Sequence, residues 1–367
     1  MRMALRRAAL VSAAAACVTL VTCGPALAAS AGSLSMVSAR TAAAAVLGNH
    51  QISGIERAIG CLTARRCVAV GHGGGRAAGQ VVTVVAGRQV RVTVVRSASN
   101  LVAVSCPSRF GCWAIGAPRK GHHNFVLVRI GPAGNVATVI TVQIRGGVSL
   151  ASISCASMTS CEVFGTARSA IFLNKWYLAT WSGRTLSQPY MVGLVEYDLP
   201  GGISCWQATC VAIGSWIGEG GGSPAGDTIL ITNGGTLGAV AYPSGAGLSG
   251  VSCVSSSVCY AATLDTKVAT LNDGALGSTQ NLPLYAGTSI ECDGATCWAA
   301  GLSGNPPYPA EFVMIANGVP AGSAVIDRAL TVPSPAAYPA ITRRGNGFAA
   351  VGAAVNGGPR VSEVVTN

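Results

Sequence analysis

Short apolar runs separated by Gly-rich turns recur along most of the chain. Residues 81–85 and 90–95 are valine-rich runs that flank the turn sequence Ala86-Gly87-Arg88. β-Branched runs of this length between turn residues predict strands joined as hairpins. Helical periodicity is nearly absent outside a short predicted helix at residues 41–47. The pattern therefore predicts an all-β protein.

A phrase built around two cysteines is repeated six times along the chain. Its second cysteine opens an apolar phrase, for example CVAVG at 67–71, CWAIG at 112–116 and CVAIG at 210–214. The first cysteines of successive pairs lie 39 to 50 residues apart. A seventh copy, FAAVG at 348–352, has no cysteine. Self-similarity at a period of this size indicates a repeat architecture.

Each repeat unit reads as four strands. The first strand runs into the cysteine pair, the second leaves it, and two more are joined by a turn such as Asn272-Asp273-Gly274. Such turns supply the positive φ angles that two-residue hairpins need. We therefore expect a seven-bladed β-propeller of four-stranded antiparallel blades. A β-helix or another solenoid is the alternative. The last unit ends one strand early, at 360–366, and residues 33–39 are expected to close it.

The paired cysteines are expected to form local disulfides. Four or five residues separate the members of each pair, which suits a short hairpin loop. Facing residues on antiparallel strands have Cα atoms about 4.5 to 5.5 Å apart, within the disulfide range. Zinc is the alternative, but structural zinc sites usually bring two pairs together. The expected disulfides are Cys61–Cys67, Cys106–Cys112, Cys155–Cys161, Cys205–Cys210, Cys253–Cys259 and Cys292–Cys297.

The first 28 residues have the pattern of a secretory signal peptide. Three arginines within residues 1–7 precede an apolar stretch at 8–20, and the sequence ALA at 26–28 fits a cleavage site. We expect a single propeller domain over 29–367, secreted into an oxidising extracellular environment. The sequence LVTC at 20–23 also resembles a lipobox, which would place a lipid on Cys23. No later run reaches the roughly 18 apolar residues of a transmembrane helix.

Composition and charge narrow the function classes. Only 10% of the residues are charged while 50% are hydrophobic, which excludes a disordered or coiled-coil protein. The formal net charge is +11, but the basic residues are scattered. No Lys/Arg run exceeds two residues after the signal peptide, so we expect no nucleic acid as a partner.

The phrases VSCPS at 104–108 with CWAIG at 112–116, and ISC at 203–205 with CVAIG at 210–214, resemble the paired-cysteine repeats of exported actinobacterial β-propeller proteins. The resemblance covers nearly the whole chain after the signal peptide and implies a secreted propeller. The chain is more distantly similar to Asp-box propellers such as sialidases, through Asp273-Gly274. No catalytic residue of a sialidase can be placed on this sequence.

Candidate site residues lie in loops predicted on the face opposite the cysteine hairpins, where propeller loops vary without disturbing the sheets. The loop at 119–124 has two adjacent histidines, but two ligands are too few for a metal, so we expect a solvated basic loop and no metal site. The candidate ligand-binding residues are Tyr197, Trp216, Asp227, Arg119, Lys120, His122 and His123. The candidate catalytic carboxylates are Glu196, Asp198 and Glu219.

We expect a non-catalytic binding module that acts as a monomer and needs no cofactor. Its partner would be a glycan, an envelope polymer or an extracellular protein. The alternative is a secreted carbohydrate-active hydrolase or lyase, which would need two carboxylates converging about 5 to 10 Å apart in a pocket. A purely structural role is the third hypothesis, and it needs neither a pocket nor a binding patch.

Overall fold

A computed structural model describes the following residues: 54–73, 78–86, 88–119, 124–144, 148–168, 174–195, 198–217, 224–241, 245–284, 286–302, 309–321, 325–331, 340–344, 347–351 and 364–365. The chain divides into two units, Met1–Ala42 and Ala43–Asn367, and every described residue belongs to the second. The expected signal peptide, Cys23, the strand at 33–39 and the helix at 41–47 lie outside the described residues.

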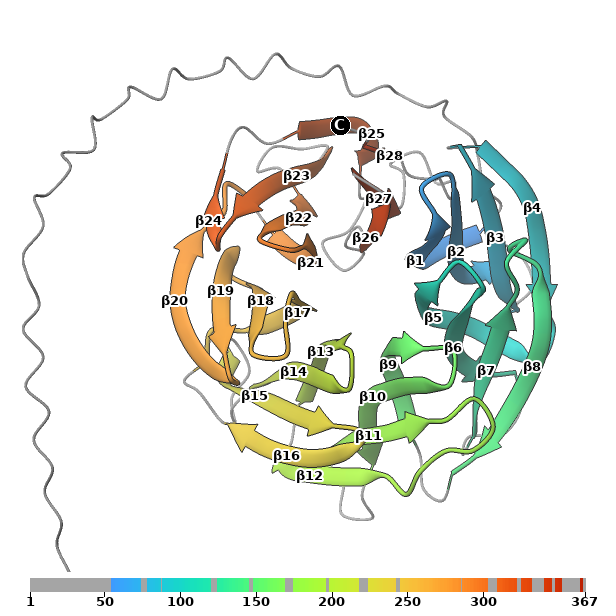
Figure 1. The fold of residues 1–367 in the computed structure, drawn as a ribbon, viewed down its shortest axis with the longest axis horizontal. Coiled ribbons are helices and arrows are strands. Elements are labelled where there is room, and N and C mark those ends of the chain that lie inside the picture. The colour runs from blue at the N-terminus through green and yellow to red at the C-terminus, as the bar shows by residue number, and fades with distance from the viewer. Residues whose placement is uncertain are drawn as a thin grey trace, which may run out of the picture. The chain divides into compact units, whose positions relative to one another are not determined.

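All the elements in the described part of the chain are β-strands, and six antiparallel sheets form blades (Figure 1). Blade 1 contains β1 (Gly54–Thr63), β2 (Arg66–Gly73), β3 (Gly79–Val85) and β4 (Arg88–Val95). Blade 2 contains β5 (Ala98–Ser108), β6 (Gly111–Pro118), β7 (Asn124–Ile130) and β8 (Val136–Gln143). Blade 3 contains β9 (Val148–Ser157), β10 (Ser160–Arg168), β11 (Asn174–Trp181) and β12 (Tyr190–Val195).

The next three blades repeat this order of strands. Blade 4 contains β13 (Asp198–Trp206), β14 (Thr209–Ile217), β15 (Pro224–Asn233) and β16 (Thr236–Ala241). Blade 5 contains β17 (Leu248–Cys253), β18 (Val258–Thr263), β19 (Lys267–Asn272) and β20 (Ala275–Asn281). Blade 6 contains β21 (Ala286–Asp293), β22 (Thr296–Leu302), β23 (Pro309–Ala316) and β24 (Val319–Pro320), and β25 (Val325–Thr331) also pairs with β23.

The expectation of seven four-stranded blades is wrong, because the described residues form six blades. The seventh sequence unit gives only a three-stranded sheet, made of β26 (Ala340–Arg344), β27 (Gly347–Val351) and β28 (Val364–Val365). Its inner hairpin has no cysteine pair, and its third strand has two residues. Strands this short contribute few ladder hydrogen bonds.

The first strand of each blade lies at the hub of the ring (Figure 1). Strand β1 contacts β5, and the same neighbour relation continues through β9, β13, β17 and β21. Strand β26 contacts both β21 and β1, so the three-stranded sheet lies between blade 6 and blade 1. The second strand of each blade is covered on both faces by neighbouring sheets. This explains why the phrase after the second cysteine is apolar at nearly every position instead of alternating.

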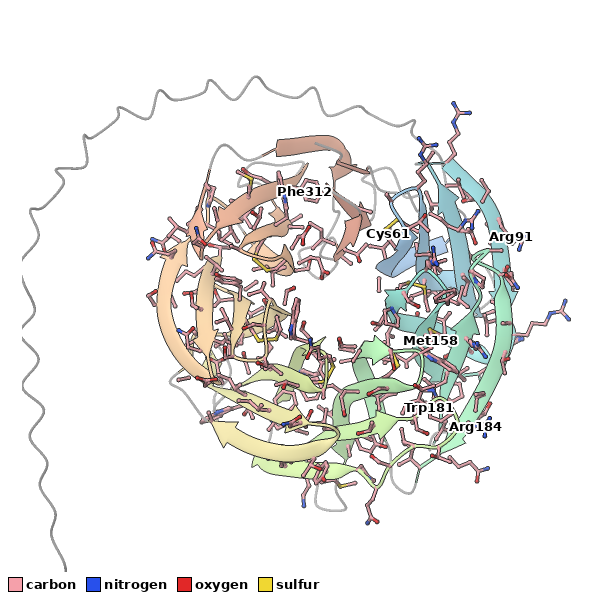
Figure 2. The ribbon with its side chains drawn as sticks, viewed as in Figure 1. Cys61, Arg91, Met158, Trp181, Arg184 and Phe312 are labelled. Carbon is pink, nitrogen blue, oxygen red and sulfur yellow. A yellow bond between two sulfur atoms is a disulfide. The ribbon has the colours of Figure 1, made fainter. Side chains whose placement is uncertain are left out.

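The expected disulfides are present in all six blades. Each joins the first and second strands next to the hairpin turn, and the Cα atoms of the paired cysteines lie 3.9 to 4.1 Å apart. Figure 2 shows them as yellow bonds, while Arg91 and Arg184 point outward from the rim of the ring. Each disulfide closes a loop of only a few residues, so the chain-entropy model gives about 2 kcal/mol for each one.

Aromatic side chains join the middle blades. Trp113 of blade 2 and Trp181 of blade 3 meet edge to face, with ring centroids 5.5 Å apart. The Trp113 indole N–H also donates a hydrogen bond of 2.9 Å to the carbonyl of Met158, in the hairpin of blade 3. Edge-to-face aromatic pairs add about 0.5–1.5 kcal/mol beyond burial. Blades 2 and 3 are therefore held in a defined orientation by an aromatic pair and a hydrogen bond, in addition to apolar burial.

The turn glycines of the outer hairpins also contact the preceding blade. Asp273 and Gly274 have φ angles of 48° and 79°, as expected for a two-residue hairpin. A Cβ at Gly274 would lie 2.2 Å from Cδ1 of Ile231 in blade 4. Glycine is needed at this turn for its conformation and for the close approach of the neighbouring blade.

The glycine that ends the CWAIG phrase is explained by a bulge in the inner strand. The register between β5 and β6 shifts between Leu101 and Ala103, next to Gly116. This shift brings the backbone of Asn100 so close that a Cβ at Gly116 would lie 2.0 Å from its carbonyl oxygen. Only glycine fits this position without moving the backbone.

We expect Gly116→Ala to lower the free energy of unfolding by about 1–3 kcal/mol, because the added methyl group must displace backbone atoms. Gly238→Ala is the matched control, since the nearest atom to a Cβ there is 3.6 Å away. Denaturant unfolding of both variants measures the difference. Equal stability of the two variants would show that the bulge does not constrain Gly116.

No helix in the described residues is both long and apolar enough to span a membrane.

Candidate functional site

A ring of polar side chains surrounds the hub at one position of the repeat, the residue before the first cysteine of each pair. Four blades have serine at this position, and blade 6 has Glu291. In the three-stranded sheet the same position is Thr342, because Arg343 faces Phe348 where the other inner hairpins have their cysteine pair. The four serines are Ser105, Ser154, Ser204 and Ser252.

Each serine of the ring bonds to the next blade. The Cys155 amide donates to Oγ of Ser105 at 3.0 Å, and the Cys205 amide donates to Oγ of Ser154 at 2.9 Å. The same bond joins the later blades in turn. The two further pairs are Cys253 N to Ser204 Oγ at 2.9 Å and Cys292 N to Ser252 Oγ at 3.0 Å. We call these four bonds the serine belt.

The serine belt satisfies backbone groups that the blades themselves leave unpaired. The first strand of a blade is an edge strand, so half of its N–H groups have no partner in its own sheet. At the hub these groups face the neighbouring blade, where an unpaired buried N–H costs about 1–3 kcal/mol. The serine hydroxyl accepts from the amide and keeps its own O–H as a donor. Blade 1 has Gly60 at this position, where a Cβ would lie 2.7 Å from Sγ of Cys106.

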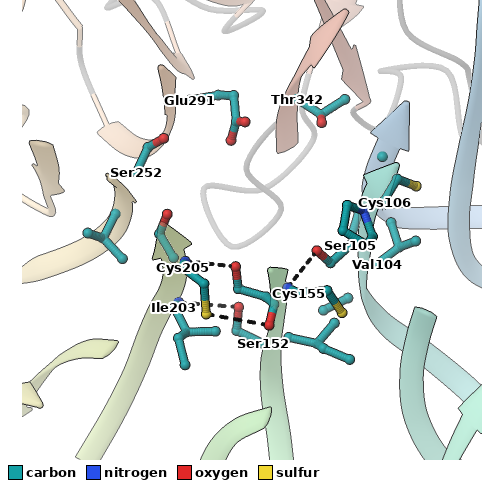
Figure 3. A pocket seen from close by; sticks show the side chains of 18 of the residues that line it. Val104, Ser105, Cys106, Ser152, Cys155, Ile203, Cys205, Ser252, Glu291 and Thr342 are labelled. Atoms are coloured by element: carbon teal, nitrogen blue, oxygen red, sulfur yellow. Dashed lines mark hydrogen bonds between the residues drawn. The ribbon is translucent and has the colours of Figure 1, made fainter. Parts of the chain in front are cut away.

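The ring of polar residues lines a central cavity of about 450 Å³ (Figure 3). All the inner strands, β26 included, contribute to its wall. In Figure 3 the Glu291 carboxylate points into the cavity, across from the hydroxyl of Ser105. Among the residues that the structure places around this cavity, Glu291 is the one with an ionisable side chain apart from disulfide-bonded cysteines. The volume is within the range of about 300–1,000 Å³ typical of ligand sites.

The cavity opens among the cysteine hairpins. Trp206, in the hairpin of blade 4, lines the cavity and is also 40% exposed, so the cavity reaches the surface there. Phe110, in the hairpin of blade 2, is 64% exposed, and the guanidinium of Arg109 lies 5.1 Å from its ring centroid. Arg65 is exposed at the tip of the blade 1 hairpin. The face on which the cavity opens therefore has exposed aromatic and arginine side chains in its hairpins.

Most of the predicted site residues lie outside the described part of the structure, so their arrangement stays a prediction. Glu196, Tyr197, Glu219, Lys120, His122 and His123 lie outside the described residues. Asp198 begins β13, but the position of its side chain is outside the described part of the structure. Arg119 is exposed after β6, and Trp216 is half-buried, with its indole close to Gly226.

Asp227 has a structural role in the connection between two blades. Its side chain is 0% exposed and accepts hydrogen bonds from the hydroxyl of Ser215 and from the amides of Ala246 and Leu248. The two amides belong to the segment that enters blade 5, so Asp227 fixes the connection between blades 4 and 5. A carboxylate with three internal donors and no exposed surface is not available to a ligand.

Glu162 is a second buried carboxyl group, and it lies on β10, away from the cavity lining. It is 4% exposed, and the Thr180 hydroxyl donates to its Oε1 at 2.8 Å. Burial raises the pKa of Glu162 from 4.5 to about 7, and the hydrogen bond from Thr180 lowers it by a smaller amount. This group titrates near neutrality but does not line the central cavity, so its protonation affects stability and not the candidate site.

The polar ring is the part of the site that sequence reasoning missed. Serine precedes cysteine in four units, and the periodicity of that serine was visible in the sequence. By itself, the phrase around each cysteine pair predicts only a strand leading into a disulfide. No group of three or more metal-ligating side chains occurs within the described ranges.

No protein-family model matches the chain, and no curated protein matches it. Solved β-propeller structures are similar to it in fold. "Structure of U3-55K" matches with a TM-score of 0.59 and 11% identity, covering 88% of this chain and 98% of that chain. "YCF48 bound to D1 peptide" matches with a TM-score of 0.54 and 13% identity, covering 87% and 95%. The WD40 β-propeller domain of Doa1 matches with a TM-score of 0.54 and 12% identity, covering 86% and 94%. At these identities the likeness shows a β-propeller fold and nothing further.

We expect Ser204→Ala to lower the free energy of unfolding by about 1–3 kcal/mol, because the Cys253 amide loses its acceptor. Ser256→Ala is the control, since Ser256 is exposed in the hairpin of blade 5. Urea unfolding of the two oxidised variants measures the effect. An unchanged midpoint for Ser204→Ala would mean that the serine belt does not hold the blades together.

Glu162 makes stability depend on pH. Its pKa of about 7 in the folded chain exceeds the ordinary 4.5, so the folded state binds the proton more tightly. The free energy of unfolding therefore falls as pH rises through 4.5 to 7, by about 3 kcal/mol in total. We expect Glu162→Gln to match the wild-type protein at pH 4 and to be more stable at pH 8. Thermal unfolding at both pH values measures this, and equal stability at pH 8 would contradict it.

Proposed function

We propose that the protein is a non-catalytic binding module that holds a polypeptide segment of a partner protein at the cysteine-hairpin end of its central cavity. The observation that carries this proposal is the polar cavity at the hub. Its wall consists of side chains already fixed by the serine belt, and its entrance has an exposed tryptophan. A rigid, concave and polar site with an aromatic edge suits recognition without large rearrangement.

The entrance favours a polypeptide over a glycan. Sugar rings bind by stacking on open aromatic faces, but the guanidinium of Arg109 lies over the ring of Phe110. Tryptophan, phenylalanine and arginine side chains are enriched in protein interfaces. Trp206, Phe110 and the exposed Arg65 and Arg109 give that composition at the hairpin face. A similar propeller, YCF48, has been solved bound to a D1 peptide, which supports the same use of this fold here.

The cavity does not favour catalysis. Acid–base hydrolysis of a glycoside needs two carboxyl groups in one pocket. Glu291 is the one carboxylate in the described lining. We therefore propose that the protein binds its partner without turnover. Glycans and envelope polymers are the alternative ligands, and the binding experiment below distinguishes them from peptides.

The proposed site belongs to an exported protein. Six disulfides indicate an oxidising environment. We propose that the signal peptide at 1–28 directs export and is removed, as in the exported actinobacterial propellers that the cysteine repeats resemble. The released chain, from residue 29, acts as a monomeric extracellular binding protein.

The test is a binding screen with the oxidised chain from residue 29 on a random-peptide array and, in parallel, on a glycan and cell-wall polymer array. We expect peptide binding that falls at least about tenfold in Trp206→Ala, because aromatic anchors at an entrance contribute most of the affinity. Val139→Ala is the control, since Val139 is also exposed but lies on β8 at the rim.

Two results would overturn the proposal. The first is binding to glycans with no binding to peptides. The second is peptide binding that Trp206→Ala leaves unchanged, because it would place the interaction on another surface. Release of products from either array would replace the binding module with an enzyme.

A further inference from the structure

We propose that Glu291 makes the cavity selective for a cationic side chain, a lysine or arginine of the bound segment. This inference rests on the proposed function and names the chemistry that the cavity recognises. The carboxylate lies in the wall of the cavity, half-buried, and points toward its interior (Figure 3).

Glu291 is an exception at its position of the repeat. It occupies the position that serine has in blades 2 to 5 and threonine has in the three-stranded sheet. Serine at this position is sufficient to bond to the next blade, as Ser252 does with the Cys292 amide. Glutamate is longer than serine and charged, so its carboxylate extends from the same ring into the cavity.

The rest of the wall suits the remainder of a peptide. A carboxylate has about four lone-pair sites, so it can accept from an ammonium or guanidinium group while it keeps its contacts within the protein. Opposite it, the serine hydroxyls are each fixed by an incoming amide N–H and still have an O–H to donate. Carbonyl oxygens of a peptide backbone accept such donors. One wall of the cavity thus matches a cation and the other matches backbone carbonyls.

The surrounding charge restricts which cationic segment can bind. The chain has a formal net charge of +11, and Arg65 and Arg109 are exposed in hairpins on the face where the cavity opens. Like charges repel at such an entrance, and complementary charges are favoured. A polybasic segment is therefore disfavoured. The matching segment has one lysine or arginine, which enters the cavity, and neutral or acidic residues on both sides, which face the arginines.

The test uses three short peptides of identical sequence with aspartate and serine flanks and a central lysine, Nε-acetyl-lysine or norleucine. Calorimetry with the wild-type oxidised chain is expected to give binding of the lysine peptide at least about tenfold tighter than that of the other two, because charge-assisted hydrogen bonds are the stronger ones. This comparison needs no variant, so it holds even where a cavity variant fails to fold.

Variants assign the effect to Glu291. We expect Glu291→Gln to reduce the lysine peptide to the affinity of the acetylated one and to leave the acetylated peptide unchanged. Asp265→Asn is the matched control, because it also removes one negative charge but lies at an exposed turn between β18 and β19, in an ion pair with Lys267. We expect Asp265→Asn to leave the affinities of both peptides unchanged.

The outcomes separate this inference from the proposed function. Equal binding of the lysine and acetyl-lysine peptides, or full lysine selectivity in Glu291→Gln, would overturn the cation site while leaving peptide binding intact. Tighter binding of a lysine-rich peptide than of the single-lysine peptide would overturn the restriction by the entrance. Absence of binding on the whole random-peptide array overturns the proposed function, and with it this inference.

Discussion

The structure depends on one hydrogen bond that is repeated between neighbouring blades, from the amide of a cysteine to the hydroxyl of the preceding blade's serine. Each antiparallel blade completes its own ladders except along its two edge strands, and the unpaired donors of the innermost strand face the hub. A hydroxyl side chain satisfies these donors without joining two sheets into one. The bond therefore fixes the distance between blades while each blade remains a separate sheet, and the ring keeps an open centre.

The same arrangement produces the candidate site. Side chains that hold the blades together are the side chains that line the cavity, so the wall is ordered before any partner arrives. Ordering a side chain on binding costs about 0.5–1.5 kcal/mol. The side chains of this wall are already ordered in the free protein, so binding does not carry that cost. A repeat position with a structural role in most blades can then carry a different residue in one blade. Glu291 is that residue.

Much of the fold could be predicted from the sequence, because the local signals were strong. Valine runs, Asp-Gly turns and close cysteine pairs each act within one hairpin, and they predicted strands and disulfides correctly. The number of blades was predicted wrongly because sequence units were counted, while a blade needs strands long enough to pair. The site was missed for a different reason. Sequence reasoning places binding residues in variable loops, whereas Ser204 and its equivalents lie inside the repeat. The burial of Asp227 depends on a connection between blades that no local pattern shows.

Every disulfide in the structure closes within a single hairpin, and none joins one blade to another. A cysteine therefore finds its correct partner among its nearest neighbours in the chain, as soon as that hairpin has formed. Oxidation can proceed one blade at a time, without waiting for distant segments. A gene that duplicates one such unit also duplicates a complete covalent module, so rings of this kind can grow or shrink without leaving any thiol unpaired.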